Sequence, residues 1–197
     1  MPSTPVLTIE QGVRHPSGTM ARLALELMLA TGASRQDACV MGRQNIKGDV
    51  IYYRRGETGQ DTELPLVYMP YLVAEIVQLP PSRSAFLTHG KGRAYTVESF
   101  GNWFGDQCSA AGLPDRCRAH GLRKHGATEL AEAGANEFQI MAFLAHKSTP
   151  EAFRYVRTAQ RKKLASDALA FARTKNVSNL SDWLDKYTFQ VIENKVK

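Results

Sequence analysis

The chain has 197 residues, 43% of them hydrophobic, so it can bury a core of its own, which excludes an intrinsically disordered protein. Its 25 lysines and arginines exceed its 19 acidic residues and give a formal net charge of +6, which suits a polyanionic partner or simply favours solubility. Three cysteines without a CxxC pair indicate neither a disulfide framework nor a zinc site. We find no signal peptide and no apolar run long enough to span a bilayer, so we expect a soluble cytoplasmic protein.

The first half of the chain is predicted to combine helices with a β-hairpin. After an extended lead-in of residues 1–16, Ser17 or Thr19 can cap a helix that continues to Leu29. Two β-favouring runs flank the turn-rich segment RRGETGQDT, which predicts an antiparallel hairpin. Pro70 suits the first turn of a later helix, which ends before a Pro-Pro pair. The other elements expected here are a helix at 34–41, hairpin strands at 50–53 and 63–67, and a short strand at 85–88.

The second half of the chain is predicted to be helical. Apolar residues recur every three or four positions from Thr96 to Ala111, which indicates an amphipathic helix. Further helices are expected at 120–133, 137–145, 150–157 and 161–173. The expected fold class is therefore α+β, mainly helical with one small antiparallel sheet, in a single domain over residues 17–174.

A tail of residues 175–197 is predicted to follow this domain, because the composition changes there. Ser181 can cap a last helix, in which Trp183, Leu184 and Tyr187 share one apolar face. This face could dock on a neighbouring protomer or pack on its own domain, and the sequence leaves both open.

Two histidines, an arginine and a tyrosine form the candidate site. His120 and Arg123 lie three apart at a helix start, where both side chains point to the same side and the helix dipole favours an anion. An arginine there can hold two phosphate oxygens at once. His146 follows an apolar helix face, and Tyr155 comes nine positions later. Each residue alone also fits an ordinary role, as part of a capped surface helix, a buried histidine or a core tyrosine, so only the whole set indicates chemistry.

The spacing of this set resembles that of the tyrosine recombinase, or phage integrase, family. The family signature has a His-x-x-Arg box, then Leu-Gly-His, then a nucleophilic tyrosine nine residues after that histidine. The matching residues here are HGLR at 120–123, LAH at 144–146 and Tyr155. Upstream, LATGASRQDA resembles the family's Thr-Gly-x-Arg box, and RRGETGQDTELPL resembles the turn that carries its lysine. The resemblance covers the chain from about Thr19 to Leu169.

The resemblance implies the catalytic-domain fold of DNA breaking-rejoining enzymes and site-specific recombination or integration of double-stranded DNA, without a metal ion or a nucleotide cofactor. It implies that Tyr155 is the nucleophile, which forms a 3′-phosphotyrosyl link and frees a 5′-hydroxyl. Arg123 would clamp the non-bridging phosphate oxygens, His120 would transfer a proton or hydrogen bond, and His146 would be a further phosphate donor. The family also implies a homotetramer on two DNA duplexes.

Two positions depart from the family pattern. Ser34 occupies the place of the first arginine, so we assign that role to Arg35, one residue later. Glu57 occupies the place of the lysine that gives a proton to the leaving 5′-oxygen, and an ionised acid cannot do so. Arg54 or Arg55 could supply positive charge there, but arginine holds its proton too tightly to be a good acid. We therefore expect a slow or even inactive enzyme.

As a third departure, we expect the family's separate N-terminal DNA-binding domain to be missing, because fewer than about twenty residues precede the first helix. DNA held from one side only should bind weakly and be released readily by salt. The backbone contacts that we expect, against the alternative that these side chains are merely solvated, are Lys91, Arg93, Lys124 and the basic segment from Arg157 to Lys163.

Two other functions compete with that of a recombinase. A catalytically impaired integrase remnant that acts as a DNA-binding or regulatory module is favoured by Ser34 and Glu57. A metal hydrolase that uses His120, His125 and His146 is disfavoured, because the first two lie five apart on different helix faces and no carboxylate has ligand spacing.

Overall fold

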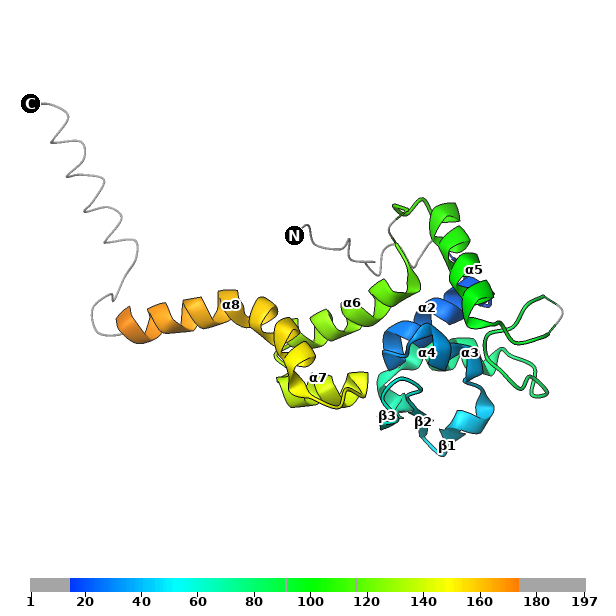
Figure 1. The fold of residues 1–197 in the computed structure, drawn as a ribbon, viewed down its shortest axis with the longest axis horizontal. Helices are drawn as coiled ribbons and strands as arrows, with labels where there is room; N and C mark the ends of the chain where they lie inside the picture. Colours follow the sequence, from blue (N-terminus) through cyan, green and yellow to red (C-terminus); the bar gives the residue numbers. More distant parts are fainter. Residues whose placement is uncertain (1–14, 91, 116, 174–197) are drawn as a thin grey trace, which may run out of the picture. The chain divides into compact units, whose positions relative to one another are not determined.

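The structure, a computed structural model, describes residues 15–90, 92–115 and 117–173. The chain divides into two compact units, residues 1–158 and 159–197, and the sheet and the apolar core belong to the first. The described part of the second unit is the C-terminal portion of α8. The elements in chain order (Figure 1) are α2 (Met20–Thr31), α3 (Arg35–Val40), η1 (Arg43–Asn45), β1 (Ile46–Lys47), β2 (Val50–Arg54), β3 (Asp61–Pro65), η2 (Leu66–Tyr68), α4 (Pro70–Val77), α5 (Val97–Ala110), α6 (Ala119–Glu132), α7 (Glu137–Leu144) and α8 (Thr149–Arg173).

Local sequence determines both ends of α2. The hydroxyl of Thr19 accepts a hydrogen bond from the amide of Arg22, which satisfies one of the free N–H groups of the first turn. Gly32 ends the helix in the left-handed conformation with φ 61°, which a residue without a Cβ adopts readily. A Cβ at Gly32 would also collide with the ring of Phe143. The turn after α2 therefore packs closely against α7.

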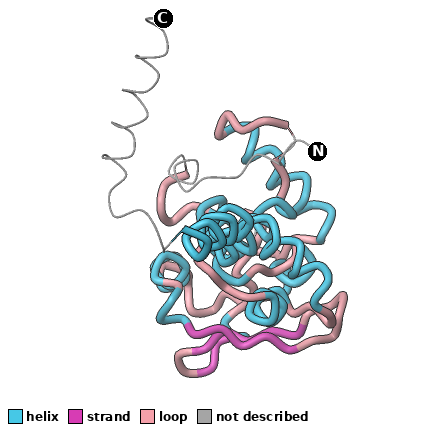
Figure 2. The backbone as a smooth tube through the Cα atoms, turned by 90° about the vertical axis from the view of Figure 1, so that its left-hand side faces the viewer, coloured by secondary structure: helices cyan, strands magenta, loops and turns pink. Residues whose placement is uncertain are grey.

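Three short antiparallel strands form the sheet, in the order β1, β2, β3 (Figure 2). β2 pairs with β3 from Val50 opposite Pro65 to Arg54 opposite Asp61. Side chains alternate along β2, so that Tyr53 is buried and Arg54 is exposed. The alternation continues one residue past the strand, where Arg55 is buried.

The core is built around α2, which packs against α4 and α6, while α5 packs against α3. Leu27 and Met28 of α2, Phe100 of α5 and Leu122 of α6 are fully buried. Burying side chains of this size stabilises the fold by roughly 1.5–3 kcal/mol each. Because Leu122 directly precedes Arg123, this packing also fixes the orientation of the helix that carries the site arginine.

The described chain is mainly helical with a small antiparallel sheet, which confirms the predicted fold class, and every helix expected within the described residues is present. The strand expected at 85–88 is wrong. Phe86 and Leu87 are buried in a bent segment that does not pair with a strand in the described chain. Only Thr88 forms an isolated bridge, to Ala94. Burial in the core, and not strand pairing, explains why this run is apolar.

The helices expected at 150–157 and 161–173 form one continuous helix, α8, because neither Gly nor Pro separates them. The tail helix expected around Trp183 lies outside the described residues. Of the helices that the structure describes, none is long and apolar enough to cross a membrane.

Candidate active site

A cleft of about 670 Å³ lies between the hairpin loop, α6 and the junction of α7 with α8. Five of its lining residues are basic and two are acidic, so an anion is the ligand that its charge favours. The lining residues are Arg55, Glu57, Thr58, His120, Arg123, Lys124, His146, Lys147, Ser148, Glu151, Arg154 and Tyr155.

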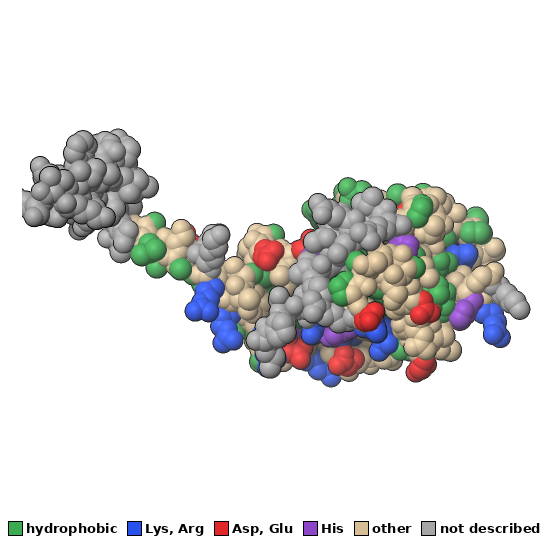
Figure 3. All heavy atoms as spheres, turned by 90° about the horizontal axis from the view of Figure 1, so that it is seen from above, with side chains coloured by type: hydrophobic (Ala, Val, Ile, Leu, Met, Phe, Trp, Pro, Cys, Tyr) green, Lys and Arg blue, Asp and Glu red, His purple; other side chains and the backbone are tan. Residues whose placement is uncertain are grey.

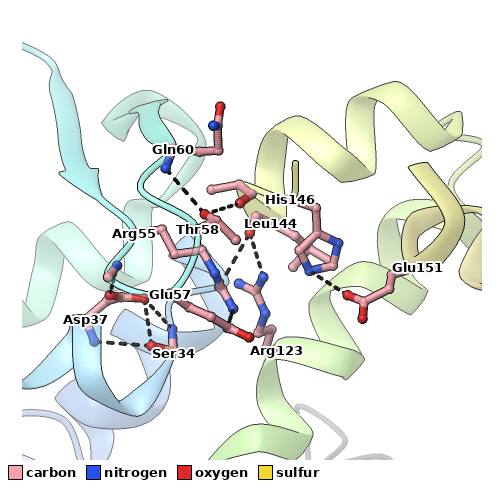
Figure 4. Close-up of polar contacts among 12 residues, drawn as sticks. Ser34, Asp37, Arg55, Glu57, Thr58, Gln60, Arg123, Leu144, His146 and Glu151 are labelled. Atoms are coloured by element: carbon pink, nitrogen blue, oxygen red, sulfur yellow. Dashed lines mark hydrogen bonds and ion pairs between the residues drawn. The ribbon is translucent and has the colours of Figure 1, made fainter. Parts of the chain in front are cut away.

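Arg123 lies at the centre of this site and is only 4% exposed. Its guanidinium donates one hydrogen bond to the backbone carbonyl of Gly32. It donates another to the carbonyl of Leu144 (Figure 4). Burial, together with the nearby charge of Arg55, lowers the pKa of Arg123 to about 10, which still leaves it protonated at neutral pH. The two carbonyls fix the plane of the guanidinium before any ligand arrives.

Arg55 is a second buried guanidinium in the cleft, at 5% exposure. It donates to the same Leu144 carbonyl at 3.4 Å and to the carboxylate of Glu57 at 2.6 Å (Figure 4). Its buried Nε has no partner among the described residues. Glu57 is 72% exposed, and the hydrogen bond from Arg55 lowers the pKa of its carboxyl. The hairpin therefore contributes both a buried cation and an exposed anion to the site.

A hydrogen bond joins the hairpin loop to the turn that carries His146. The hydroxyl of Thr58 donates to the carbonyl of Ala145 at 2.8 Å. Ala145 itself has φ 49°, in the left-handed region where L-residues are strained, and it is the one described non-glycine residue with positive φ. This turn ends α7 and brings His146 to face the cleft.

The two histidines of the cleft have lowered pKa values. Burial is the main cause for both, and the charge of Arg123 adds to it. His146 also lies 3.3 Å from the carboxylate of Glu151, which opposes the lowering without reversing it. Both imidazoles are therefore neutral near pH 7, so that each can accept a proton.

Tyr155 lies on the first turns of α8 and is half-buried in the lining of the same cleft. Burial raises the pKa of its hydroxyl, and Arg123 opposes the rise. The phenol is thus protonated at neutral pH and becomes a strong nucleophile only if a neighbouring group removes its proton.

Arg35 is not in the main cleft. It lines a neighbouring hollow of about 280 Å³, which shares Glu57, His120 and Arg123 with the cleft, and its guanidinium lies against Gly101 of α5. Ser34 is the N-cap of α3, and its hydroxyl donates to Asp37 at 2.6 Å. Because a cap residue precedes the helix, the chain turns between Ser34 and Arg35 and directs the arginine elsewhere.

The structure thus brings together Tyr155, Arg123, His120, His146 and Lys124 of the predicted residues. Arg93 and Arg157 are exposed and do not line the cleft, whereas Lys91 and the side chains of Lys162 and Lys163 lie outside the described residues. Sequence reasoning missed Thr58, Lys147 and Arg154, although the last two directly adjoin His146 and Tyr155. Among the described residues, no group of His, Cys, Asp and Glu side chains could hold a metal ion.

Comparison with known families matches residues 6–162 to the phage integrase family. Comparison with curated protein sequences gives no match. The structure is similar to lambda integrase residues 75–356 bound to DNA, with a TM-score of 0.62 and 19% identity over 79% of this chain and 60% of that one. It is also similar to XerA recombinase, with a TM-score of 0.64 and 15% identity over 85% and 65% of the two chains.

The isolated catalytic core of lambda integrase gives a TM-score of 0.57 and 20% identity over 71% of this chain and 90% of that core. This chain therefore spans nearly all of a catalytic core but only 60% of the longer lambda integrase chain. These likenesses show that the fold is that of tyrosine recombinase catalytic domains.

Proposed function

Because the chain belongs to the phage integrase family, we propose that it cuts and rejoins double-stranded DNA at specific sites through a 3′-phosphotyrosyl intermediate. One observation carries the proposal. A protonated phenol, Tyr155, lines the same cationic cleft as the buried Arg123 and two neutral imidazoles. A buried arginine beside a tyrosine suits an attack on phosphorus, in which negative charge grows on the phosphate oxygens.

In the proposed reaction, the Tyr155 oxygen attacks the phosphorus of a DNA phosphodiester. A bond forms between that oxygen and phosphorus, the bond from phosphorus to the 5′-oxygen breaks, and the strand ends as a free 5′-hydroxyl. We assign His120 to accept the tyrosine proton, because its lowered pKa leaves it neutral in the cleft. Arg123 and His146 stabilise the charge on the non-bridging oxygens.

The leaving 5′-oxygen needs a proton, and Glu57 lies where the family has a lysine. Its lowered pKa keeps Glu57 ionised at neutral pH, so it has no proton to give. The loss of a general acid typically slows such a step by roughly 10²–10⁴-fold. We therefore propose a slow enzyme in which water protonates the leaving oxygen.

DNA binding would use the residues around the cleft. Lys124 lines it, and the exposed Arg93 and Arg157 are assigned to the DNA backbone. A lambda integrase tetramer has been seen on a Holliday junction, and we propose a homotetramer on DNA for this chain as well. We also propose that residues 17–174 act as the catalytic domain and that the tail from 175 contributes to assembly.

The test is covalent capture on a suicide substrate. The chain is incubated with a pool of nicked duplexes of randomised sequence, in which the short strand beyond the cut diffuses away and prevents rejoining. A denaturing gel should show protein-linked DNA with the native chain and none with Tyr155→Phe, which differs by one oxygen.

Two results contradict this proposal. A link that survives in Tyr155→Phe would mean that another residue is the nucleophile. DNA binding without any covalent product would support the rival function, a DNA-binding remnant, which Ser34 and Glu57 favour.

A further inference from the structure

Arg55 is the strongest unexplained feature of the cleft. The family pattern gives no role to an arginine at this place in the hairpin, yet the side chain is 5% exposed and faces the same lining as Tyr155. A fixed positive charge is costly to bury unless hydrogen bonds or an anion compensate for the lost water. A buried cation that lines a cleft therefore suits the binding of an anion.

The partners of Arg55 leave its charge incompletely satisfied. It shares the Leu144 carbonyl with Arg123, so two guanidiniums converge on one neutral oxygen. Its Nε is buried without a partner among the described residues. The two cations repel each other, and this repulsion adds to burial, the larger cause, in lowering the pKa of Arg123. An anion bound between them would relieve this repulsion.

Glu57 is the only carboxylate that pairs with Arg55 among the described residues, and it comes from outside the core. The carboxylate lies 2.6 Å from Arg55 on a side chain that is 72% exposed. Because Arg55 is buried, it needs an anion, but the exposed Glu57 side chain can turn into solvent when another anion takes its place. In the free protein, Glu57 therefore stands where a phosphate oxygen could bind.

We propose that Arg55 is the second phosphate-binding guanidinium of this site, supplied by the hairpin, and that Glu57 holds it until DNA displaces the carboxylate. The proposal rests on the proposed function, because the phosphate is that of the DNA strand to be cut. Arg55 would thus be a catalytic residue that touches the scissile phosphate beside Arg123.

Ser34, which occupies the position of the family's first arginine, helps to hold the hairpin in place instead. Ser34 caps α3 and donates to Asp37, and the other carboxylate oxygen of Asp37 accepts the amide of Gly56 at 2.9 Å (Figure 4). Gly56 directly follows Arg55, and a Cβ there would crowd Gln36. This anchor holds the backbone next to Arg55 and directs the side chain into the cleft.

The first experiment measures the rate of covalent capture on the nicked pool. Arg55→Gln should slow capture by about 10²–10³-fold, the usual effect of removing one donor to a developing oxyanion. Arg54→Gln is the matched control, because Arg54 is the preceding residue, is 72% exposed and faces Asp61. A normal rate in Arg55→Gln, or a larger loss in Arg35→Gln, would overturn the proposal.

The second experiment needs no catalysis. Thermal unfolding of the full chain is followed at increasing inorganic phosphate, which stabilises a protein that binds it. Glu57→Gln, an exposed change that spares the fold, should tighten phosphate binding several-fold, whereas Arg55→Gln should weaken it by about tenfold or more. In the double variant, the Glu57→Gln effect should vanish.

The two experiments distinguish failure of the proposed function from failure of the Arg55 proposal. A native chain that makes no covalent product refutes the proposed function, yet the phosphate titration still decides whether Arg55 binds the anion. If Glu57→Gln tightens phosphate binding equally with and without Arg55, Glu57 acts on another cation and the proposal is wrong.

Discussion

Arg123 combines a structural role with the chemical role that we propose for it. Its hydrogen bonds to Gly32 and Leu144 join the end of α2 to the end of α7, so the arginine connects two turns of the fold. A donor that is already fixed does not have to reorganise when charge develops on a ligand. The free-energy cost of orienting the guanidinium is therefore met when the protein folds, before any ligand binds.

Glu57 is the residue whose replacement should change the rate most informatively. Glu57→Lys restores a proton donor beside the leaving oxygen and should speed cleavage of ordinary DNA by about 10²-fold or more. Glu57→Gln removes the negative charge without adding an acid, so it serves as the control. The measurement is the initial rate of covalent capture for each variant.

A sulfur-bridged substrate separates the two effects of Glu57→Lys. When the leaving atom is a 5′-thiol, with a pKa of about 8.5, it departs without a proton donor. On that substrate, the Lys and Gln variants should react at similar rates. Equal rates on ordinary DNA as well would show that Glu57 acts through its charge alone and not through a missing acid.

At the level of single residues, the sequence predicted the members of the site that lie on one continuous stretch. His120, Arg123, His146 and Tyr155 all line the cleft, because helix geometry and a short turn determine how residues at these spacings meet. Arg35 does not line it, since one position along a helix turns a side chain by about 100°. The direction of Arg55 depends on a contact between α3 and the hairpin that no local pattern indicates.

The turn between α7 and α8 stores strain that a single substitution should release. Ala145 has φ 49°, where an L-residue costs roughly 1–2 kcal/mol, and the family has glycine at this place. Ala145→Gly should raise the free energy of unfolding by about 0.5–1 kcal/mol after the entropy of the glycine is counted. Urea denaturation of the two proteins measures the difference.

Ala133→Gly is the matched control for this prediction. Ala133 also follows a helix, α6, but has φ −70°, which alanine adopts without strain. The same substitution should therefore destabilise the protein, by about 0.5–1 kcal/mol. If both glycine variants lose stability, the strain at Ala145 is not released by removing the Cβ.

At the level of elements, caps and apolar spacing predicted the helices, whereas the path of irregular segments depended on tertiary packing. Thr19, Ser34, Thr96 and Asn136 each cap a helix with a side-chain hydrogen bond, which is a local signal that the sequence carries. Residues 85–88 look like a strand because most of them are apolar, yet they are buried in the core without forming one. No local signal distinguishes these two kinds of burial.

Over the whole molecule, charge should determine how DNA binding responds to salt. Figure 3 shows basic side chains mixed with acidic ones on the face that it presents, so this face is not uniformly basic. The cleft, by contrast, has five basic and two acidic lining residues. Binding should therefore involve few phosphate contacts, so it should be weak, and log K should fall with log salt along a shallow slope.

Lys124 provides the corresponding test. Lys124→Gln should weaken binding similarly on every duplex sequence and reduce the slope of log K against log salt by about 1. Lys47→Gln is the control, because Lys47 lies over the ring of Tyr52 on the sheet and does not line the cleft. Fluorescence anisotropy with labelled duplexes over a salt series gives both slopes. Equal slopes for the native chain and Lys124→Gln would remove Lys124 from the proposed DNA contacts.

The most direct test of the account is to identify the amino acid that becomes joined to DNA. The covalent product from the nicked pool is digested with nuclease and protease, and the modified peptide is sequenced by tandem mass spectrometry. We predict a nucleoside 3′-phosphate on the oxygen of Tyr155 and a free 5′-hydroxyl on the released strand. A nucleotide attached to any other residue, or joined through a 5′-phosphate, would contradict the account.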